Sequence, residues 1–332
     1  MVSEAPLAPS RSLVKRIVPL AVTVVVFALI LRRIPIDRLV AAMRDADHLR
    51  FLLLMVPNTI IYFCWDTLIL ATAIRWFHGP IRFSELLPAR AVSYVVALFN
   101  TNLARGALAG YLSRRLQLPF LQLGSTVIFL VLTEYTHLVA WATVGLIAAG
   151  NATPHELLWV PPVVAGFWLV FLAYTRFNVR PWDIVRIIGR GRRFPHETGG
   201  IRQWALFRTF RIAPVKRYAQ MVLLRAPMFF VSLCLHYFAA QAFGIHIPFA
   251  QMIAFLPVIF MVAALPITVA HLGTTQAAWI YFFSAYAAPE QLLAFSLAAH
   301  ATFSATRALF SVAFTPRAYA DVVRPASTRH VA

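Results

Sequence analysis

The stretch AALPITVAHLGTTQAAW, residues 263–279, separates two apolar runs that are each long enough to lie inside a bilayer. Within it stand Pro266, Thr268, His271, Gly273, Thr274, Thr275 and Gln276. A helix that is interrupted inside a membrane frees backbone N–H and C=O groups, and lipid cannot satisfy them. Such an interruption must therefore line protein or water. The alternative is an ordinary turn outside the membrane.

The overall composition places this stretch in an integral membrane protein. The 332 residues are 60% hydrophobic and 13% charged, with a mean hydropathy of +0.72, which is more apolar surface than a soluble domain of this length could bury. The formal charge of +18 comes mostly from arginines between apolar runs, as the positive-inside rule requires. We therefore expect anionic lipid headgroups as partners, and no nucleic acid. The two cysteines form no metal or redox spacing.

Apolar runs of about 20 residues are the signal of spanning helices. Candidate runs cover residues 13–31, 51–77, 85–99, 119–149, 157–174, 219–242, 248–264 and 289–314, with a further apolar piece ending near 287. The piece IDRLVAAMRDADHLR, residues 36–50, has the mixed charges of a helix that lies in the membrane interface. Residues 176–217 hold eleven Lys and Arg against Asp183 and Glu197, which predicts a cytoplasmic loop.

Charge placement predicts one all-α membrane domain over residues 1–332, with six to eight transmembrane helices. Our preferred topology has six spans and two re-entrant hairpins, one in a first half (1–150, break near 100–110) and one in a second half (218–315, break near 265–276). This is the arrangement of an inverted repeat in the cell inner membrane, with both termini cytoplasmic. Eight plain spans are the alternative. The preferred orientation leaves Arg32, Arg33, Arg38, Arg44 and Arg50 outside, against the positive-inside rule.

Two acidic residues, Asp66 and Glu134, lie deep in apolar runs. A charge at that depth costs at least about 2.5 kcal/mol, so each must face a polar cavity, pair with a base or be protonated. Either a structural ion pair or a transport role would satisfy this. Glu134 and His137 share one helical face. The Glu-x-x-His spacing also occurs in di-iron sites, but no second copy is present. No metal, cofactor or catalytic motif is recognisable, so we expect no enzyme.

The run 289–314 carries a polar stripe of Ser296, His300, Ser304, Arg307 and Ser311 at steps of three and four. Small residues at this spacing suit a helix–helix seam, whereas Arg307 suits an anion contact in a polar cavity. Arg225 lies nearer the cytoplasmic end of its run and could reach the interface, so the sequence assigns it no role.

Several motifs resemble the flippase-like transmembrane region of lysylphosphatidylglycerol synthases in its free-standing form. The likeness spans about residues 35–315, and the motifs are ILATAIRWF (69–77), FNTNLARGALAG (99–110), LSRRLQLP (112–119), TEYTH (133–137) and ALPITVAHLGTTQAA (264–278) with Arg307 downstream. The resemblance implies an all-helical protein with two re-entrant elements. It also implies movement of charged or polyprenyl-linked lipids between leaflets, and partner enzymes of lipid or glycan synthesis.

The chain departs from this family pattern at both breaks. The family usually has an acidic residue after the glycine of each break, whereas residues 103–118 contain none and Gln276 stands at the second position. Only about eighteen residues follow the last run, so we do not expect this chain alone to aminoacylate lipid.

These observations predict a protein that binds an anionic or polyprenyl-linked lipid and helps to translocate it between leaflets. The alternatives are a membrane-embedded lipid-modifying enzyme that uses Glu134 and His137, and a scaffold subunit of a lipid or glycan biosynthesis complex. The candidate lipid-binding residues are Asp66, Arg105, Glu134, His137, His271, Thr274, Gln276, His300 and Arg307.

Overall fold

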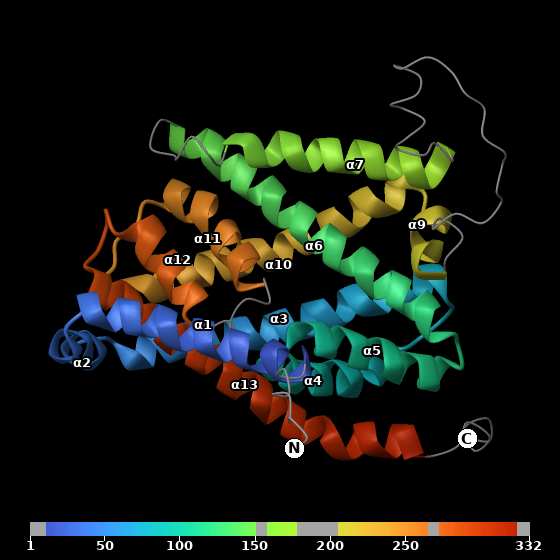
Figure 1. Ribbon diagram of the computed structural model, residues 1–332, viewed down its shortest axis with the longest axis horizontal. Helices are drawn as coiled ribbons and strands as arrows, with labels where there is room; N and C mark the ends of the chain where they lie inside the picture. Colours follow the sequence, from blue (N-terminus) through green and yellow to red (C-terminus); the bar gives the residue numbers. More distant parts are fainter. Residues whose placement is uncertain (1–10, 151–157, 178–204, 265–271, 324–332) are drawn as a thin grey trace, which may run out of the picture.

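The computed structural model describes residues 11–150, 158–177, 205–264 and 272–323, and these residues form helices and connecting segments without a strand. The prediction of an all-α protein is therefore confirmed for the described part of the chain. Its helices are α1 (Arg11–Arg33), α2 (Ile36–Arg44), α3 (His48–Phe77), α4 (Phe83–Phe99), α5 (Thr101–Leu116), α6 (Phe120–Ala149), α7 (Val160–Phe177), the 3₁₀ turn η4 (Ala205–Phe207), α9 (Arg208–Ile212), α10 (Val215–Gln241), α11 (Phe249–Ala263), α12 (Thr274–Phe283) and α13 (Pro289–Val323). Most of them run along the long axis of the molecule (Figure 1).

Three of the described helices are long and apolar enough to cross a bilayer. They are α3 with 30 residues, residues 120–148 of α6 and the 27 residues of α10. The predicted runs 51–77, 119–149 and 219–242 coincide with them to within a few residues. Prolines stand immediately before α6 and α10, where the missing N–H costs no helix hydrogen bond. These helices give the chain the spans of a multi-pass membrane protein.

Helices α4 and α5 form a hairpin, and a single non-helical residue, Asn100, separates them. Asn100 has an extended backbone, and its Oδ1 accepts the N–H of Leu103 at 3.0 Å, which caps the start of α5. The interruption therefore lies at the first residue of the predicted range 100–110. The glycine-containing stretch NLARGALAG, which we expected to be the break, continues as helix α5. The cap satisfies the new helix start, and the two glycines are tolerated inside the helix.

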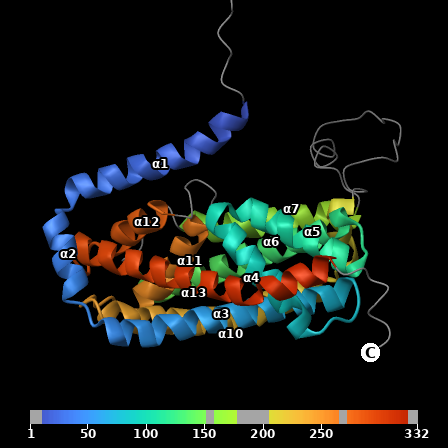
Figure 2. The same cartoon turned by 90° about the horizontal axis from the view of Figure 1, so that it is seen from below.

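Helices α11 and α12 form the second hairpin. Residues 265–271, which hold most of the predicted break, lie outside the described residues. Helix α12 begins after Gly273, whose φ of +91° favours glycine and whose N–H donates to Gln276 Oε1 at 2.6 Å. The hairpins α4–α5 and α11–α12 enter the bundle from opposite ends and point toward its middle (Figures 1 and 2).

Helix α1 stands apart from the main bundle, and α2 joins it to one end (Figure 2). Its point of contact is the start of α12, because a methyl group added to Gly273 would lie 3.1 Å from Cγ1 of Val26. The backbone angle at position 273 favours glycine, and the close approach of α1 adds to this preference.

The antiparallel pair α6 and α11 makes the closest helix contact. A methyl group at Gly145 would overlap the backbone of Ala254, so only glycine allows the two backbones to approach this far. Nearer the middle of the bundle, Tyr135 donates its hydroxyl to the carbonyl of Ala264 at 3.4 Å. The two contacts fix α6 against the second hairpin.

A candidate lipid-binding cavity

A cavity of about 310 Å³ lies in the middle of the bundle, lined by residues of α3, α4, α5, α6, α10, α11, α12 and α13. Ala104 and Arg105 come from the first hairpin, and Ala263, Ala264 and Thr275 from the second. Segments that are about 160 residues apart in the sequence therefore meet at one site. The charged lining residues are Asp66, Arg90, Arg105, Glu134, Arg225 and Arg307, which is an excess of two positive charges.

Most of the residues that the sequence singled out lie at this cavity. The lining includes Asp66, Arg105, Glu134, His137, His300 and Arg307. Of the other three, His271 lies outside the described residues, whereas Thr274 and Gln276 are absent from the lining, which takes Thr275 from the same turn. The buried Gln276 caps α12 through Gly273 instead.

Asp66 is tied to the first hairpin by an ion pair. Its Oδ2 accepts from Arg90 Nη2 of α4 and from the Tyr94 hydroxyl at 2.9 Å. The side chains of Asp66 and Arg90 are 7% and 18% exposed, so the pair is largely removed from solvent. The sequence offered Asp66 either a structural ion pair or a place at a polar cavity. The structure shows both, since the carboxylate is paired with an arginine and also faces the cavity.

Arg307 is enclosed by aromatic rings. Its guanidinium carbon lies 3.7 Å from the ring centre of Phe303, 4.0 Å from Tyr94 and 5.8 Å from Tyr62. These distances are within the range of cation–π attraction, which holds the cation without neutralising it. Its Nε atom is buried and has no hydrogen-bond partner. Arg307 thus presents an unneutralised positive charge to the cavity.

The polar stripe of α13 serves two purposes along its length. Ser296, His300, Ser304 and Arg307 line the cavity, as expected for a cavity wall. One turn further on, the Ser311 hydroxyl donates to the carbonyl of Ala91 in α4, as expected for a helix–helix seam. The sequence could not separate these uses, because both need the same spacing on one helix face.

Glu134 and His137 lie together, but their side chains do not bond to each other. The carboxylate of Glu134 accepts a long hydrogen bond of 3.5 Å from the Tyr62 hydroxyl. His137 Nδ1 lies 2.9 Å from the backbone carbonyl of Glu134, and its Nε2 is buried without a partner. The donor at Nδ1 is satisfied locally, which leaves Nε2 as the atom that can accept from a ligand or, in the protonated ring, donate to one.

Arg225 is the main residue that the sequence missed. It is only 1% exposed, and its Nη2 donates to the carbonyl of Leu130 in α6 at 3.0 Å. Its Nε and Nη1 atoms have no partner. The expectation that it reaches the interface was wrong, because ten residues separate it from the start of α10 at Val215, which is about 15 Å of helix. That depth is the signal that could have identified it.

The described residues contain no group of three His, Cys, Asp or Glu side chains placed to hold a metal ion. Arg90, Arg225 and Arg307 each hold at least one buried N–H group without a partner at the cavity. Such donors are the complement of a phosphate.

Comparison with known proteins assigns the chain to a family. No curated protein gives a significant match. Residues 16–303, in contrast, match the family described as the lysylphosphatidylglycerol synthase TM region. The match covers most of the chain and includes every residue that lines the cavity except those after 303. The chain therefore belongs to the lysylphosphatidylglycerol synthase TM region family.

Proposed function

We propose that the protein binds an anionic or polyprenyl-linked lipid by its headgroup in the central cavity and helps it to move between leaflets. The observation that carries this proposal is the set of buried donor atoms without partners at the cavity: Asn58 Nδ2, Arg90 Nε, Arg225 Nε and Nη1, and Arg307 Nε. Each buried, unsatisfied donor costs about 1–3 kcal/mol, and more when it is charged. A phosphate has enough acceptor oxygens to satisfy several of them at once.

The charge balance of the cavity supports the same proposal. The lining carries four arginines against the two carboxylates of Asp66 and Glu134, and Asp66 is paired with Arg90. A net positive site inside an apolar bundle attracts a headgroup with negative charge, because the low dielectric strengthens the interaction. A long apolar tail can stay in the bilayer while the headgroup occupies the site.

The opposed hairpins support movement between leaflets. One enters from each end of the bundle, and both contribute to one cavity (Figure 1). We infer that they are the re-entrant elements of an inverted repeat in the cell inner membrane, with six spans and both termini in the cytoplasm. A site built by two such elements can open alternately to either side.

Glu134 and His137 serve binding in this proposal. The carboxylate of Glu134 accepts from the Tyr62 hydroxyl, and Nε2 of His137 is left to contact the headgroup. We propose a protein that is not an enzyme and uses no cofactor. Enzymes of lipid or glycan synthesis would act on the lipid before or after it crosses.

Leaflet transfer in reconstituted vesicles tests the proposal. Vesicles would contain fluorescent phosphatidylglycerol or a fluorescent polyprenyl phosphate, and a membrane-impermeant quencher would report the outer leaflet. We expect wild-type protein to accelerate transfer of at least one of these lipids, and Arg225→Gln to slow it at least tenfold. Lys216→Gln is the matched control, because Lys216 is exposed at the start of the same helix.

Two outcomes would overturn the proposal. One is an unchanged rate of transfer of both lipids with and without protein. The other is an Arg225→Gln variant that transfers lipid as fast as wild type. Mass spectrometry of the recovered lipid separates the enzyme alternative, since modification would change the mass of the product.

A further inference from the structure

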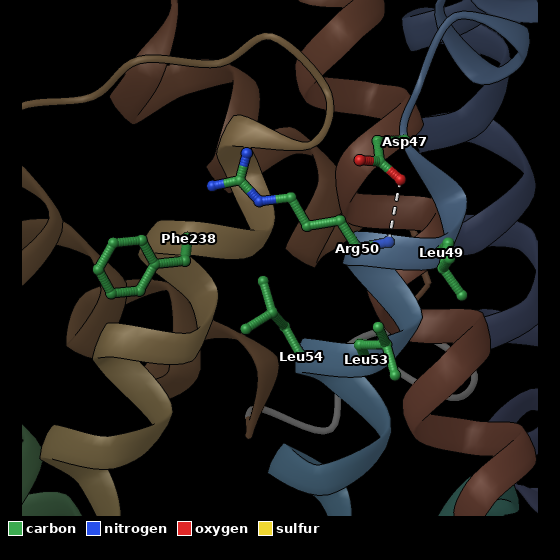
Figure 3. A pocket seen from close by; sticks show the side chains of 6 residues that line it. All are labelled: Asp47, Leu49, Arg50, Leu53, Leu54 and Phe238. Carbon is green, nitrogen blue, oxygen red and sulfur yellow. Dashed lines mark hydrogen bonds between the residues drawn. The ribbon is translucent and has the colours of Figure 1, made fainter.

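A second site lies on the outside of the bundle, at the junction of α3 and α10. It is an open groove of about 370 Å³, lined by Asp47, Leu49, Arg50, Leu53, Leu54 and Phe238. None of these residues lines the central cavity. Figure 3 shows Arg50 reaching from α3 toward α10, above the gap between Leu54 and Phe238.

The groove is held open by contacts between the two helix ends. The N–H of Asp47 donates to the carbonyl of Ala242 at 2.8 Å, which joins the start of α3 to the end of α10. Arg50 Nη2 donates to Gln241 Oε1 at 3.1 Å, and this bond fixes the guanidinium over the groove. The mouth is therefore built from a positioned arginine rather than a freely moving one.

The walls of the groove are suited to an acyl chain. Leu49 is 71% exposed, Leu53 65% and Phe238 46%. All three belong to helices that are long and apolar enough to cross a bilayer, so the surrounding solvent at this face is lipid. An open groove between two such helices has room for a lipid tail.

The neighbouring helix α2 sets the depth of the groove mouth. On α2, Ile36 and Val40 are 64% and 53% exposed beside the exposed Arg38 and Arg44, as in a helix that lies in the interface. Arg50 stands only six residues after the end of α2. Its charge therefore lies near the depth of α2, at headgroup level. Leu54 lies one helical turn deeper, about 6 Å along the axis, where acyl chains begin.

The charges at the mouth select the type of headgroup. Asp47 caps the start of α3 and Arg50 lies in its first turn, so both charged side chains stand at the same end of the groove that they line. Asp47 Oδ1 accepts the backbone N–H of Arg50, which leaves the other carboxylate oxygen as an acceptor. One positive and one negative group at the mouth of one groove fit a headgroup that carries both a phosphate and an ammonium.

We propose that this groove binds one phospholipid with an ethanolamine-type headgroup. Arg50 binds the phosphate, Asp47 accepts from the ammonium, and one acyl chain lies between Leu54 and Phe238. The site holds a lipid of the surrounding bilayer at the edge of the bundle. It is independent of the central cavity and does not depend on whether lipid crosses the membrane.

Native mass spectrometry of the full-length protein tests the site. Detergent-solubilised protein would be given phosphatidylethanolamine or phosphatidylglycerol with identical acyl chains, and the bound lipids would be counted. In the Arg225→Gln variant, whose central cavity is impaired, we expect one ethanolamine lipid per protein to be retained about threefold more strongly than the glycerol lipid, the size expected of an exposed ion pair. Equal retention of the two lipids by this variant, or stronger retention of phosphatidylglycerol, would overturn the proposal.

Four variants locate the binding. Asp47→Asn keeps a good helix cap, so the fold is preserved, and it should abolish the preference without weakening phosphatidylglycerol. Arg50→Gln should weaken both lipids, whereas Arg44→Gln, an exposed control on α2, should change neither. An Asp47→Asn variant that keeps the preference would refute the site. So would Arg225→Gln abolishing the preference, because that would place the lipid in the central cavity.

Discussion

At the scale of single residues, Arg225 is a position where stability and binding make opposite demands. Its buried guanidinium makes one hydrogen bond and leaves two nitrogen atoms unpartnered. Replacing buried charged groups by apolar residues of similar volume is often neutral or stabilising by 1–4 kcal/mol. A residue kept under such a cost is expected to serve binding.

We therefore predict that Arg225→Met leaves the thermal midpoint unchanged or raises it, while lipid transfer falls at least tenfold. Scanning fluorimetry in detergent measures the midpoint, and the vesicle assay measures transfer. Lys216→Met is the control and should alter neither. A midpoint lowered by several degrees would show that Arg225 holds the structure together instead.

His78 is a second residue with a predictable energetic role. It lies just beyond the end of α3, with Nε2 at 2.7 Å from the Thr126 hydroxyl, which in turn contacts Thr209 at 2.9 Å. Burial, with a smaller effect of the nearby Arg208, lowers the pKa of His78 to about 4. The folded protein therefore favours the neutral ring, and the unfolded chain, with a pKa near 6.5, binds the proton more readily.

This difference predicts a loss of stability in acid. The contribution of His78 is fully present above pH 6.5 and is lost as the pH falls toward about 4, where the folded state also takes up the proton. We expect the thermal midpoint to decrease over this window, and His78→Gln to flatten the decrease. His246→Gln, at an exposed position, is the control. An equally steep decrease in His78→Gln would contradict the assignment.

The sequence predicted those site residues whose depth in an apolar run was itself a signal. Asp66 and Glu134 stood out because a charge far inside an apolar run needs a reason. Arg90 and Arg225 did not, because arginine can extend along a helix, and whether it does depends on the helices packed around it. We predicted Thr274, whereas Thr275 lines the cavity. Adjacent residues on a helix face different directions, and the sequence did not show which of the two faces inward.

At the scale of helices, the contact between α6 and α11 depends on one missing side chain. A methyl group at Gly145 would overlap the backbone of Ala254, and a backbone cannot turn aside as a side chain can. Overpacking of this kind costs about 1–3 kcal/mol.

We predict that Gly145→Ala lowers the thermal midpoint and the yield of folded protein. Gly166→Ala is the matched control, because Gly166 lies in α7 with open space around the position of a methyl group. Alanine is the better helix former, so the control should be neutral or slightly stabilising. Equal effects of the two substitutions would mean that the close approach of α6 and α11 is unimportant.

Helix ranges were predictable because the length of an apolar run matches the thickness of the bilayer. The position of the first interruption, in contrast, was predicted wrongly. Glycines in NLARGALAG suggested a break, but glycine only permits a change of direction and does not cause one. The interruption lies at Asn100, where a side chain can replace the helix hydrogen bond.

At the scale of the whole molecule, the arrangement of helix ends predicts the topology. The end of α5 and the start of α10 lie at one end of the bundle, and α2 lies at the other (Figures 1 and 2). We expect the first end to face the cytoplasm because Arg114, Arg115, Lys216 and Arg217 gather there.

Cysteine labelling checks this topology. In a variant without Cys64 and Cys234, we expect Arg114→Cys and Lys216→Cys to react with an impermeant thiol reagent only after the membrane that holds the protein is opened. Arg44→Cys should react while that membrane is intact. Reaction of Arg114→Cys and Arg44→Cys from the same side would rule out the predicted topology.

The sequence indicated several residues of the cavity, but it could not give the shape of the cavity. Eight helices contribute to it, and their packing decides which face of each is turned inward. The pairing of the two hairpins was inferred from the charges of the flanking loops and from the corresponding places of the two breaks in the halves of the chain, and their residues do line one cavity. Its aromatic enclosure of Arg307 arises from α3, α4 and α13 together, which no local pattern encodes.

The contact between α6 and α11 also restricts the route of a lipid tail. Over the ten residues from Tyr135 to Gly145 the two helices are joined at both ends, at Ala264 and Ala254. The backbones meet at Gly145 and the Tyr135 side chain bridges the helices at the other end, which closes this seam to a hydrocarbon chain. A lipid whose headgroup is bound in the cavity must therefore pass its tail between other helices. Opening the seam between α6 and α11 would create a second lateral exit for the tail.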